Sequence, residues 1–239
     1  INIVLKKTIK TAQRELQLGA GADRADKTAR TNLQLSDRDG RFSYSVSAST
    51  RHTRIDRDAP FVDEAYDAGG RPVMLRRTSS GETVRFDVFN LVPRLNWTLD
   101  NGDTVSSQNF FSYTRTRFQA DQETQTTIGG APRFPVMDWR IPSMTGLLRS
   151  DLLWTRKLEQ GAKLDLKVGV QLTKADNVSS RLGYGAEPPV LLLDSDVDTR
   201  TKGRGFSTTG KYSTPMGDGH ALTMGWEGST LARREQRIQ

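Results

Sequence analysis

The sequence predicts an all-β protein whose strands run antiparallel and up-and-down in one open, curved sheet. Three observations support this prediction: apolar and polar residues alternate over long stretches, these stretches are long for strands, and tight turns alternate with long polar connections. Alternation gives a strand one apolar and one polar face. Soluble strands have about five or six residues, whereas a tilted membrane-spanning strand needs about nine to eleven. We therefore predict about nine long strands that form a section of a transmembrane β-barrel.

The stretch 30–54 carries this alternation near the start of the chain. Two long arms meet at a predicted turn over Asp37–Gly40. The second arm alternates four apolar residues with four serines: Phe42, Tyr44, Val46 and Ala48 with Ser43, Ser45, Ser47 and Ser49. The serine face suits water, and the opposite face requires an apolar medium.

Later strands repeat the pattern, with two irregularities. Residues 164–172 alternate without a break. The strand over 83–97 changes phase, which predicts a β-bulge near Asp87–Phe89. In the strand that follows, the adjacent Phe110 and Phe111 must face opposite sides, so the phase of that strand stays open.

Four tight turns and three long polar loops are predicted between the strands. The turns are Asp37–Gly40, Asp100–Asp103, Glu159–Gly161 and Met216–Gly219. The loops cover about 54–82, 120–143 and 175–202. Outer-membrane barrels join their strands by short periplasmic turns and longer extracellular loops, and we expect the same sides here. Trp97 and Trp154 lie close to turns, where such barrels carry an aromatic girdle.

The composition excludes several classes of protein. The chain has 239 residues, no cysteine and a formal net charge of +7, and its mean hydropathy is −0.60. Without cysteine there is no disulfide framework, thiolate zinc site or cysteine nucleophile. The sequence contains no run of about 18 apolar residues, so it predicts no transmembrane helix. The Lys and Arg residues are scattered and no basic helix is visible, so we do not expect a nucleic-acid partner.

No motif for catalysis or for a cofactor is found in the sequence. The two histidines, His52 and His220, stand beside no nucleophile motif, and neither Gly-x-Ser-x-Gly nor His-Glu-x-x-His occurs. We therefore expect no enzymatic activity and no cofactor. Both histidines are expected at polar positions near a strand end or a turn.

One acidic run is a weak candidate for a metal site. Asp194, Asp196 and Asp198 resemble the opening of a calcium-binding loop. Thr199 stands where such a loop requires glycine and Gly205 where it requires glutamate, so the run fails as an EF-hand. A looser loop site for a hard cation is one hypothesis, and three solvated carboxylates are the other.

The second predicted loop, 120–143, is the best candidate for ligand contacts. It contains Arg133, Phe134, Trp139 and Arg140, a mixture suited to anionic or aromatic cargo. The alternatives are that these side chains pack within the loop or attract anionic lipopolysaccharide.

The first residues, Ile1-Asn2-Ile3-Val4-Leu5-Lys6-Lys7, read as a short strand ahead of the hairpins. Together with those hairpins, this segment resembles the TonB-dependent outer-membrane receptors, in which a globular plug ends in such a strand and the barrel follows. The resemblance implies that 1–9 is the final plug strand and 10–239 the N-terminal part of the barrel. Barrels with a plugged lumen have about 22 strands. We therefore expect the chain to be a section of a longer protein, with the TonB box, most of the plug and the closing strands outside it.

The same resemblance implies a location and a function. The protein is expected in the outer membrane of a Gram-negative bacterium, in contact with lipid and lipopolysaccharide. External loops would capture a small, scarce nutrient such as a ferric siderophore, cobalamin or an oligosaccharide. The TonB–ExbB–ExbD complex would supply energy through the missing N-terminal part. The alternatives are a plugless porin or adhesin barrel, and a soluble β-rich binding module or sugar hydrolase.

Overall fold

The chain is described by a computed structural model over residues 12–186, 189–217 and 219–239. Its strands are β1 (Gln13–Ala22), β2 (Asp26–Asp39), β3 (Phe42–Asp58), β4 (Phe61–Tyr66), β5 (Pro72–Thr98), β6 (Thr104–Ile128), β7 (Val136–Lys157), β8 (Lys163–Tyr184), β9 (Leu191–Pro215) and β10 (Ala221–Ile238). One short 3₁₀ turn, η1 (Glu159–Gly161), joins β7 to β8. In the described ranges no helix is long and apolar enough to cross a membrane. The expected plug strand, 1–9, lies outside these ranges.

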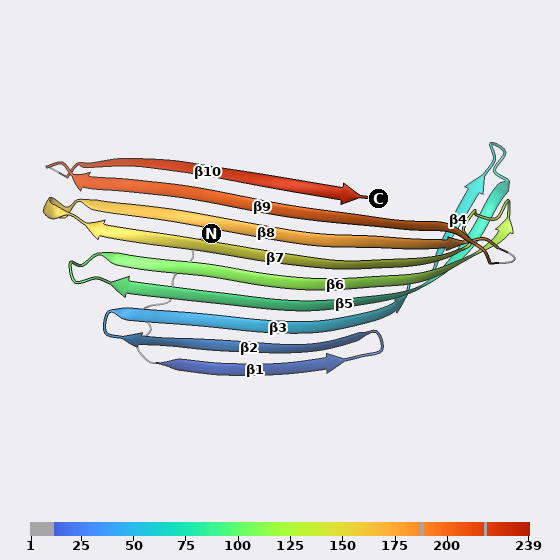
Figure 1. The fold of residues 1–239 in the computed structure, drawn as a ribbon, viewed down its shortest axis with the longest axis horizontal. Coiled ribbons are helices and arrows are strands. Elements are labelled where there is room, and N and C mark those ends of the chain that lie inside the picture. The colour runs from blue at the N-terminus through green and yellow to red at the C-terminus, as the bar shows by residue number, and fades with distance from the viewer. Residues whose placement is uncertain (1–11, 187–188, 218) are drawn as a thin grey trace.

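The ten strands form a single antiparallel sheet (Figure 1). Their spatial order is β1-β2-β3-β5-β6-β7-β8-β9-β10, and β4 pairs with β5 beside this path. Each strand of the path therefore lies next to its neighbours in the sequence. Over the described residues the sheet does not close on itself, and β1 and β10 form its two edges. The predicted all-β, up-and-down, open architecture is confirmed.

All four predicted tight turns are confirmed, and they lie at one end of the sheet, on the left in Figure 1. Each contains a glycine in the left-handed region, where a side chain would strain the backbone. The φ angles are 53° at Gly40, 82° at Gly102, 80° at Gly161 and 81° at Gly219. Local turn chemistry therefore fixes this end of the sheet, which we call the turn end; the opposite end is the far end.

The three long loops were predicted with the wrong bounds, because most of their residues are strand. β3, β6 and β8 continue through them to Asp58, Ile128 and Tyr184, and the returning strands begin at Pro72, Val136 and Leu191. β4, which the prediction missed, forms a hairpin with the start of β5 that projects at the far end (Figure 1). Backbone pairing requires no apolar side chains, so polar stretches extend the ladder equally well.

The predicted β-bulge near Asp87–Phe89 is also wrong. β5 pairs with β3 without a register shift from Gly81 to Trp97. The apolar residues of β5 change faces instead. Val84, Phe86 and Val88 point to one face of the strand, and Phe89, Leu91, Leu95 and Trp97 point to the other. The phase change in the sequence marks a change in which face is apolar.

The sheet has no hydrophobic core of its own. The only buried apolar residues in the described part of the chain are Ala120 and Ala162. Large apolar side chains are exposed instead, among them Leu18 at 74%, Val170 at 42% and Trp226 at 50%. Exposed apolar surface of this extent marks contact with another apolar medium or partner.

Candidate functional site

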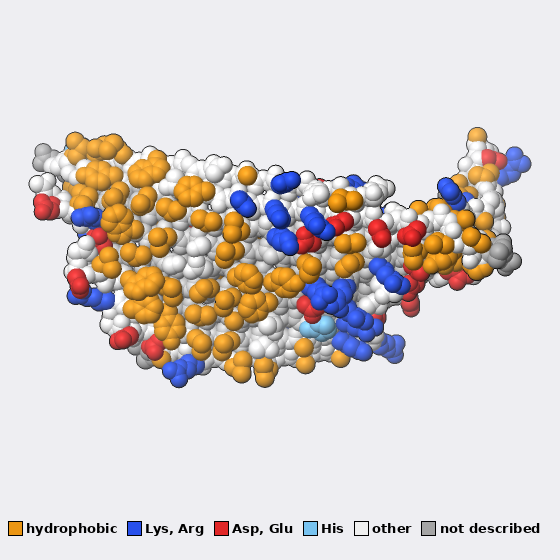
Figure 2. All heavy atoms as spheres, viewed as in Figure 1, with side chains coloured by type: hydrophobic (Ala, Val, Ile, Leu, Met, Phe, Trp, Pro, Cys, Tyr) orange, Lys and Arg blue, Asp and Glu red, His pale blue; other side chains and the backbone are white. Residues whose placement is uncertain are grey.

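The two faces of the sheet differ in chemistry over the turn half of the strands. The register places Val46, Leu95, Leu152 and Val168 on one face, which we call the belted face. The opposite face is the polar face. The apolar belt is formed on the belted face by Leu16, Leu18, Leu33, Leu35, Phe42, Tyr44, Val46, Phe89, Leu91, Leu95, Trp97, Phe111, Tyr113, Leu148, Leu152, Trp154, Leu164, Leu166, Val168, Val170, Leu172, Phe206, Tyr212, Met224 and Trp226. Figure 2 shows apolar side chains over the turn half and Lys and Arg beyond them.

The height of the apolar belt matches a bilayer. On β5 the belt runs from Trp97 to Phe89. At about 3.3 Å per residue and a tilt of roughly 40°, this stretch rises about 20 Å, against about 25 Å for the apolar band of a membrane barrel. Aromatic pairs lie at both edges, with ring centroids 5.2 Å apart for Phe42 and Trp97 and 6.0 Å apart for Phe89 and Phe111.

The far boundary of the belt crosses the strands obliquely. The first Lys or Arg beyond the belt is Arg54 on β3 and Arg204 on β9, and the cross-strand register carries Arg204 back to Ala48 on β3. Between these two strands the boundary falls by six residues over five strand spacings. The fall is uneven, because the first such residue on β7, Arg140, lies level with Asp56 and that on β10, Arg234, lies level with Thr50. The mean fall between β3 and β9 is roughly 20 Å in 24 Å, a slope of about 40°. Strands tilted by 35–45° in a flat bilayer have this slope.

The polar face carries hydroxyl, amide and charged groups over the same height. The serines of β3 lie there, as predicted, and the carboxylate of Asp151 lies between Arg149 Nε at 3.1 Å and Lys167 Nζ at 3.5 Å. Gly169 leaves the space that this carboxylate occupies. The arrangement, with one apolar and one polar face, is that of the strands of a membrane barrel.

An aromatic and basic cluster lies on the polar face near the far end. The Trp139 ring meets Phe118 edge-on, with centroids 5.7 Å apart, and the Arg181 guanidinium lies 4.5 Å from the Trp139 centroid. Trp139 Nε1 donates a hydrogen bond to Ser179 Oγ at 3.2 Å. We call these four residues the Trp139 cluster. A guanidinium held over an indole binds anionic groups while the ring remains a stacking surface.

An open hollow of about 280 Å³ adjoins the Trp139 cluster. Its walls come from β8, β9 and the end of β10, and include Ser179 and Arg181. Phe134 lies on the same face, where an added Cβ at Gly183 would come within 2.9 Å of its Cγ. Basic, amide and hydroxyl groups thus line a space suited to a small polar ligand, and the rings of Trp139 and Phe134 lie on the same face outside its walls.

The four predicted ligand-contact residues are not all brought together. Phe134 and Trp139 share the polar face, whereas Arg140 follows Trp139 on β7 and lies on the belted face. Arg133 is exposed and stacks on its neighbour, with Cζ 5.2 Å from the Phe134 centroid. Their role in ligand binding stays a prediction. Sequence reasoning missed Arg181, which joins Trp139 only through the pairing of β7 with β8.

The acidic run is a strand, which corrects the loop hypothesis. Asp194, Asp196 and Asp198 lie on β9, and alternate residues of a strand share a face. No group of three or more acidic or histidine side chains able to hold a metal occurs in the described ranges. The alternation with Ser195 and Val197 was a signal for a strand that the calcium-loop comparison obscured.

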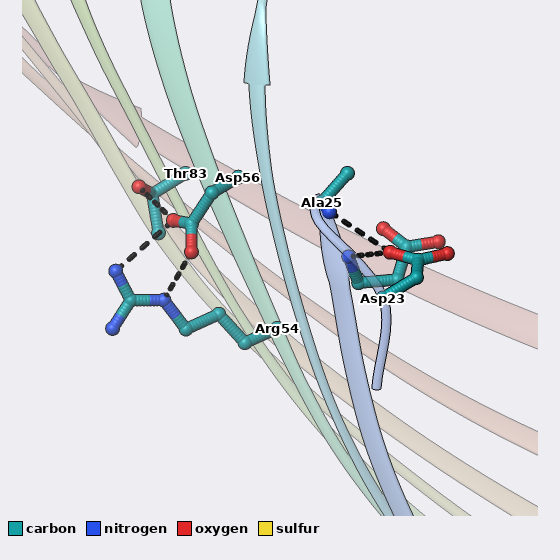
Figure 3. Close-up of polar contacts among 6 residues, drawn as sticks. Asp23, Ala25, Arg54, Asp56 and Thr83 are labelled. Atoms are coloured by element: carbon teal, nitrogen blue, oxygen red, sulfur yellow. Dashed lines mark hydrogen bonds and ion pairs between the residues drawn. The ribbon is translucent and has the colours of Figure 1, made fainter. Parts of the chain in front are cut away.

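A buttressed carboxylate lies on the belted face beyond the belt (Figure 3). Arg54 donates hydrogen bonds of 2.7 and 3.0 Å to Asp56, and Thr83 Oγ1 donates one of 2.7 Å. The hydrogen bond from Arg54, followed by that from Thr83, lowers the pKa of Asp56 below its usual value. Asp56 in turn raises the pKa of Arg54. The far part of β3 therefore holds ionised groups on the same face that is apolar toward the turn end.

The connection between β1 and β2 is closed by a second carboxylate (Figure 3). Asp23 accepts hydrogen bonds from the backbone N–H groups of Asp26 at 2.6 Å and Ala25 at 2.8 Å. These bonds, that of Asp26 first, lower the pKa of Asp23. The carboxylate thereby satisfies donors that a tight connection leaves free.

Of the two histidines, His52 lies within β3 rather than at a strand end. Its Nδ1 lies 2.6 Å from Asp87 Oδ1 on the adjacent strand. His220 lies in the connection between β9 and β10, as predicted. The His52–Asp87 pair is exposed and stands just beyond the belt, next to cationic residues.

No family model matches this chain, and no curated protein matches its sequence.

Proposed function

We propose that this chain forms part of the wall of an outer-membrane β-barrel that acts as a receptor for TonB-dependent uptake of a scarce nutrient. The oblique apolar belt carries this proposal. Its height of roughly 20 Å is close to the apolar band of about 25 Å in membrane barrels, and the mean slope of its far edge between β3 and β9, about 40°, lies in the range of strand tilts in such barrels. The face behind it is polar at the same height. A soluble sheet gives no reason for an exposed apolar band on one face that is bordered by cations and backed by a polar face.

The edges of the sheet support a larger assembly. β1 and β10 each have one unpaired side in the described sheet. In hydrocarbon each unpaired backbone group costs several kcal/mol, so a spanning sheet must close. Further strands would complete the barrel, and the lumen would be lined by the polar face.

Receptor function, rather than passive diffusion, is supported by the Trp139 cluster and its hollow. They lie toward the far end of the lumen-facing side, where a ligand entering from outside would first meet the wall. Arg181 and Trp139 offer charge and a stacking surface to a nutrient of the ferric siderophore, cobalamin or oligosaccharide class. Coupling to TonB rests on the sequence resemblance.

Growth and uptake assays test this function. A strain lacking the protein is expected to lose uptake of one nutrient, and uptake in the complemented strain should cease when TonB is absent or the proton-motive force is collapsed. Within the barrel, Trp139→Ala should lower uptake while Arg140→Ala, on the opposite face, should not. Recovery of the protein in the soluble fraction without detergent would contradict the membrane location, and TonB-independent uptake would indicate a porin.

An adhesin barrel is a second candidate, favoured by the projecting β4–β5 hairpin. This hairpin exposes Phe61, Val62 and Tyr66 beyond the sheet. Exposed apolar side chains at a projecting tip suit a protein surface. Deleting the hairpin tip should abolish adhesion and leave uptake intact if this alternative holds.

A further inference from the structure

Two rungs of the belted face, just beyond the apolar belt, carry cations on runs of four and of three successive strands. The first cation ladder consists of Lys27, Arg54, Arg85 and Arg117 on β2, β3, β5 and β6. The second cation ladder consists of Lys174, Lys202 and Arg234 on β8, β9 and β10. Each member lies directly opposite the next in the register. The concentration of blue beyond the orange belt in Figure 2 follows this edge.

Such ladders destabilise a sheet when they stand alone. Directly opposed residues have Cβ atoms about 4.5–5.5 Å apart, and like charges at that distance repel. Asp56 pairs with Arg54, and Asp176 lies 2.8 Å from Lys174. No ion pair is formed by Arg85 or Arg117 within the described ranges. The ladders therefore carry an excess of positive charge that an external anion would relieve.

Directly opposed cations are otherwise isolated in this sheet. Across the strands that the structure describes, Arg30 faces Arg51 and Lys157 faces Lys163, both on the polar face, and neither pair extends to a third strand. The ladders occur only at the far edge of the apolar belt. Their position next to the belt, and not the overall basic charge of the chain, is what requires an explanation.

We propose that the two cation ladders bind the phosphate headgroups of anionic lipids whose acyl chains cover the apolar belt. This inference rests on the proposed membrane location. Charge complementarity and continuity with the belt identify the occupant, because a lipid places its phosphate one headgroup beyond its hydrocarbon. Arg85 and Arg117 are positioned to share one phosphate between two guanidinium groups, the geometry that arginine favours for this anion.

A free anion would neutralise the cation ladders but would not cover the apolar belt next to them. Inorganic phosphate would neutralise the ladders and leave Phe89 and Tyr113, two rungs lower on the same face, exposed to water. An acidic polypeptide would likewise leave the belt uncovered. A lipid covers both, and each basic residue near an anionic membrane surface contributes about a fivefold gain in affinity.

The test measures binding of a fluorescent phosphatidylglycerol to the intact protein in neutral-detergent micelles, with fluorescent phosphatidylcholine as reference. The double variant Arg85→Gln/Arg117→Gln should lower the preference for phosphatidylglycerol by about tenfold or more. The matched control is Arg30→Gln/Arg51→Gln, which removes an equal charge from opposed arginines on the polar face. The control should keep the wild-type preference. If the first variant misfolds, judged by circular dichroism, Lys202→Gln in the second ladder replaces it with a smaller expected loss.

Other outcomes overturn the proposal. If the ladder variant and the control variant lost the preference for phosphatidylglycerol equally, the preference would depend on net charge and not on the ladders. Displacement of the lipid by millimolar inorganic phosphate would indicate a site for free phosphate, and equal competition by polyglutamate a site for an acidic protein. Insertion into phosphatidylcholine vesicles without any preference for phosphatidylglycerol would contradict the anionic-lipid site and leave the proposed membrane location intact. Failure to insert into vesicles of either lipid composition would contradict the proposed membrane location as well.

Discussion

The two halves of β5 share one hydrogen-bond ladder and differ in which face carries the apolar side chains. Toward the turn end, Leu91, Leu95 and Trp97 make the belted face apolar; toward the far end, Val84 and Phe86 place apolar groups on the polar face. The backbone pairing with β3 continues unchanged through the switch. Strand formation therefore does not depend on which face is apolar. If the proposed membrane location is right, the face pattern follows from the surroundings of the sheet.

The charges change at the same boundary. Between the turn edge and the boundary, the belted face carries large apolar groups on successive strands, whereas beyond it the same face carries the cation ladders and the Arg54–Asp56 pair. A group introduced on the belted face should therefore have opposite consequences in the two halves. The predictions below use that contrast, in order of decreasing effect.

An arginine in the middle of the belt should have the largest effect. Val46 lies between Leu35 and Pro93 at mid-belt. Val46→Arg is expected to destabilise the protein in lipid vesicles by about 2–4 kcal/mol, because a cation is moved toward the bilayer midplane. Urea titration in the vesicles measures this difference.

The control for that substitution is Ser47→Arg, one residue along on the polar face between Gln34 and Val92. Its expected change is below about 0.5 kcal/mol, the value for a surface site without special contacts. Equal destabilisation by the two substitutions would show that the belted face does not meet lipid.

Overpacking within the belt should have the next largest effect. The Trp226 ring lies directly over Gly210 on the neighbouring strand, so a Cβ at Gly210 would displace it. Gly210→Ala is expected to cost about 1 kcal/mol, the low end of the range for an added methyl, because the half-exposed Trp226 ring on the edge strand can turn away, and to shift the tryptophan emission. Gly228→Ala is the control, since its added Cβ would meet Thr208 Cγ2 at an ordinary 3.9 Å. Unchanged stability and emission in Gly210→Ala would contradict this packing.

The contrast between the halves also explains what the sequence predicts well. In the turn half, period-two alternation of large apolar with small polar residues, as in 164–172, determines both the strand and its face. The four turns follow from local glycine chemistry. In parts of the far half both faces are polar, as in Thr199-Arg200-Thr201-Lys202, so alternation in hydrophobicity disappears there and the sequence predicts loops in place of strands.

The candidate site depends on pairing that the sequence does not contain. Trp139 was predicted as a ligand contact, but Arg181 reaches its ring only because β7 and β8 extend far enough to place the two residues opposite each other. Adjacent residues of a strand face opposite sides, so Arg140 and Trp139 lie on different faces of β7. The sequence predicts a loop at these positions, and for a loop this alternation is not assumed. Register is set by the strands as a whole. Site residues on different strands therefore require the structure.

Removing the cation over Trp139 should have a smaller effect. Arg181 lies 4.5 Å from the Trp139 centroid and is exposed. Arg181→Gln is expected to destabilise the far half by about 0.5–1 kcal/mol, the range for an exposed cation–π contact, and to alter the Trp139 fluorescence. Arg140→Gln, on the opposite face, should leave that fluorescence unchanged. An identical response in the two variants would contradict the placement of Arg181.

The smallest effect is expected from pH, at the exposed Arg54–Asp56 pair beyond the belt. The hydrogen bond from Arg54 lowers the pKa of Asp56 in the folded protein, so the unfolded chain binds the proton first as pH falls. The stabilisation is therefore complete above the unfolded value near 3.8 and is lost as pH falls through the lower folded value. Asp56→Asn should flatten the decline in stability below pH 4, measured by urea titration at successive pH values. Thr83→Val should flatten it less, because Thr83 supplies the second and weaker contribution. If Asp56→Asn left the acid limb unchanged, the pair would contribute nothing to folding, as many exposed ion pairs do, and the far half would owe its order to backbone pairing alone.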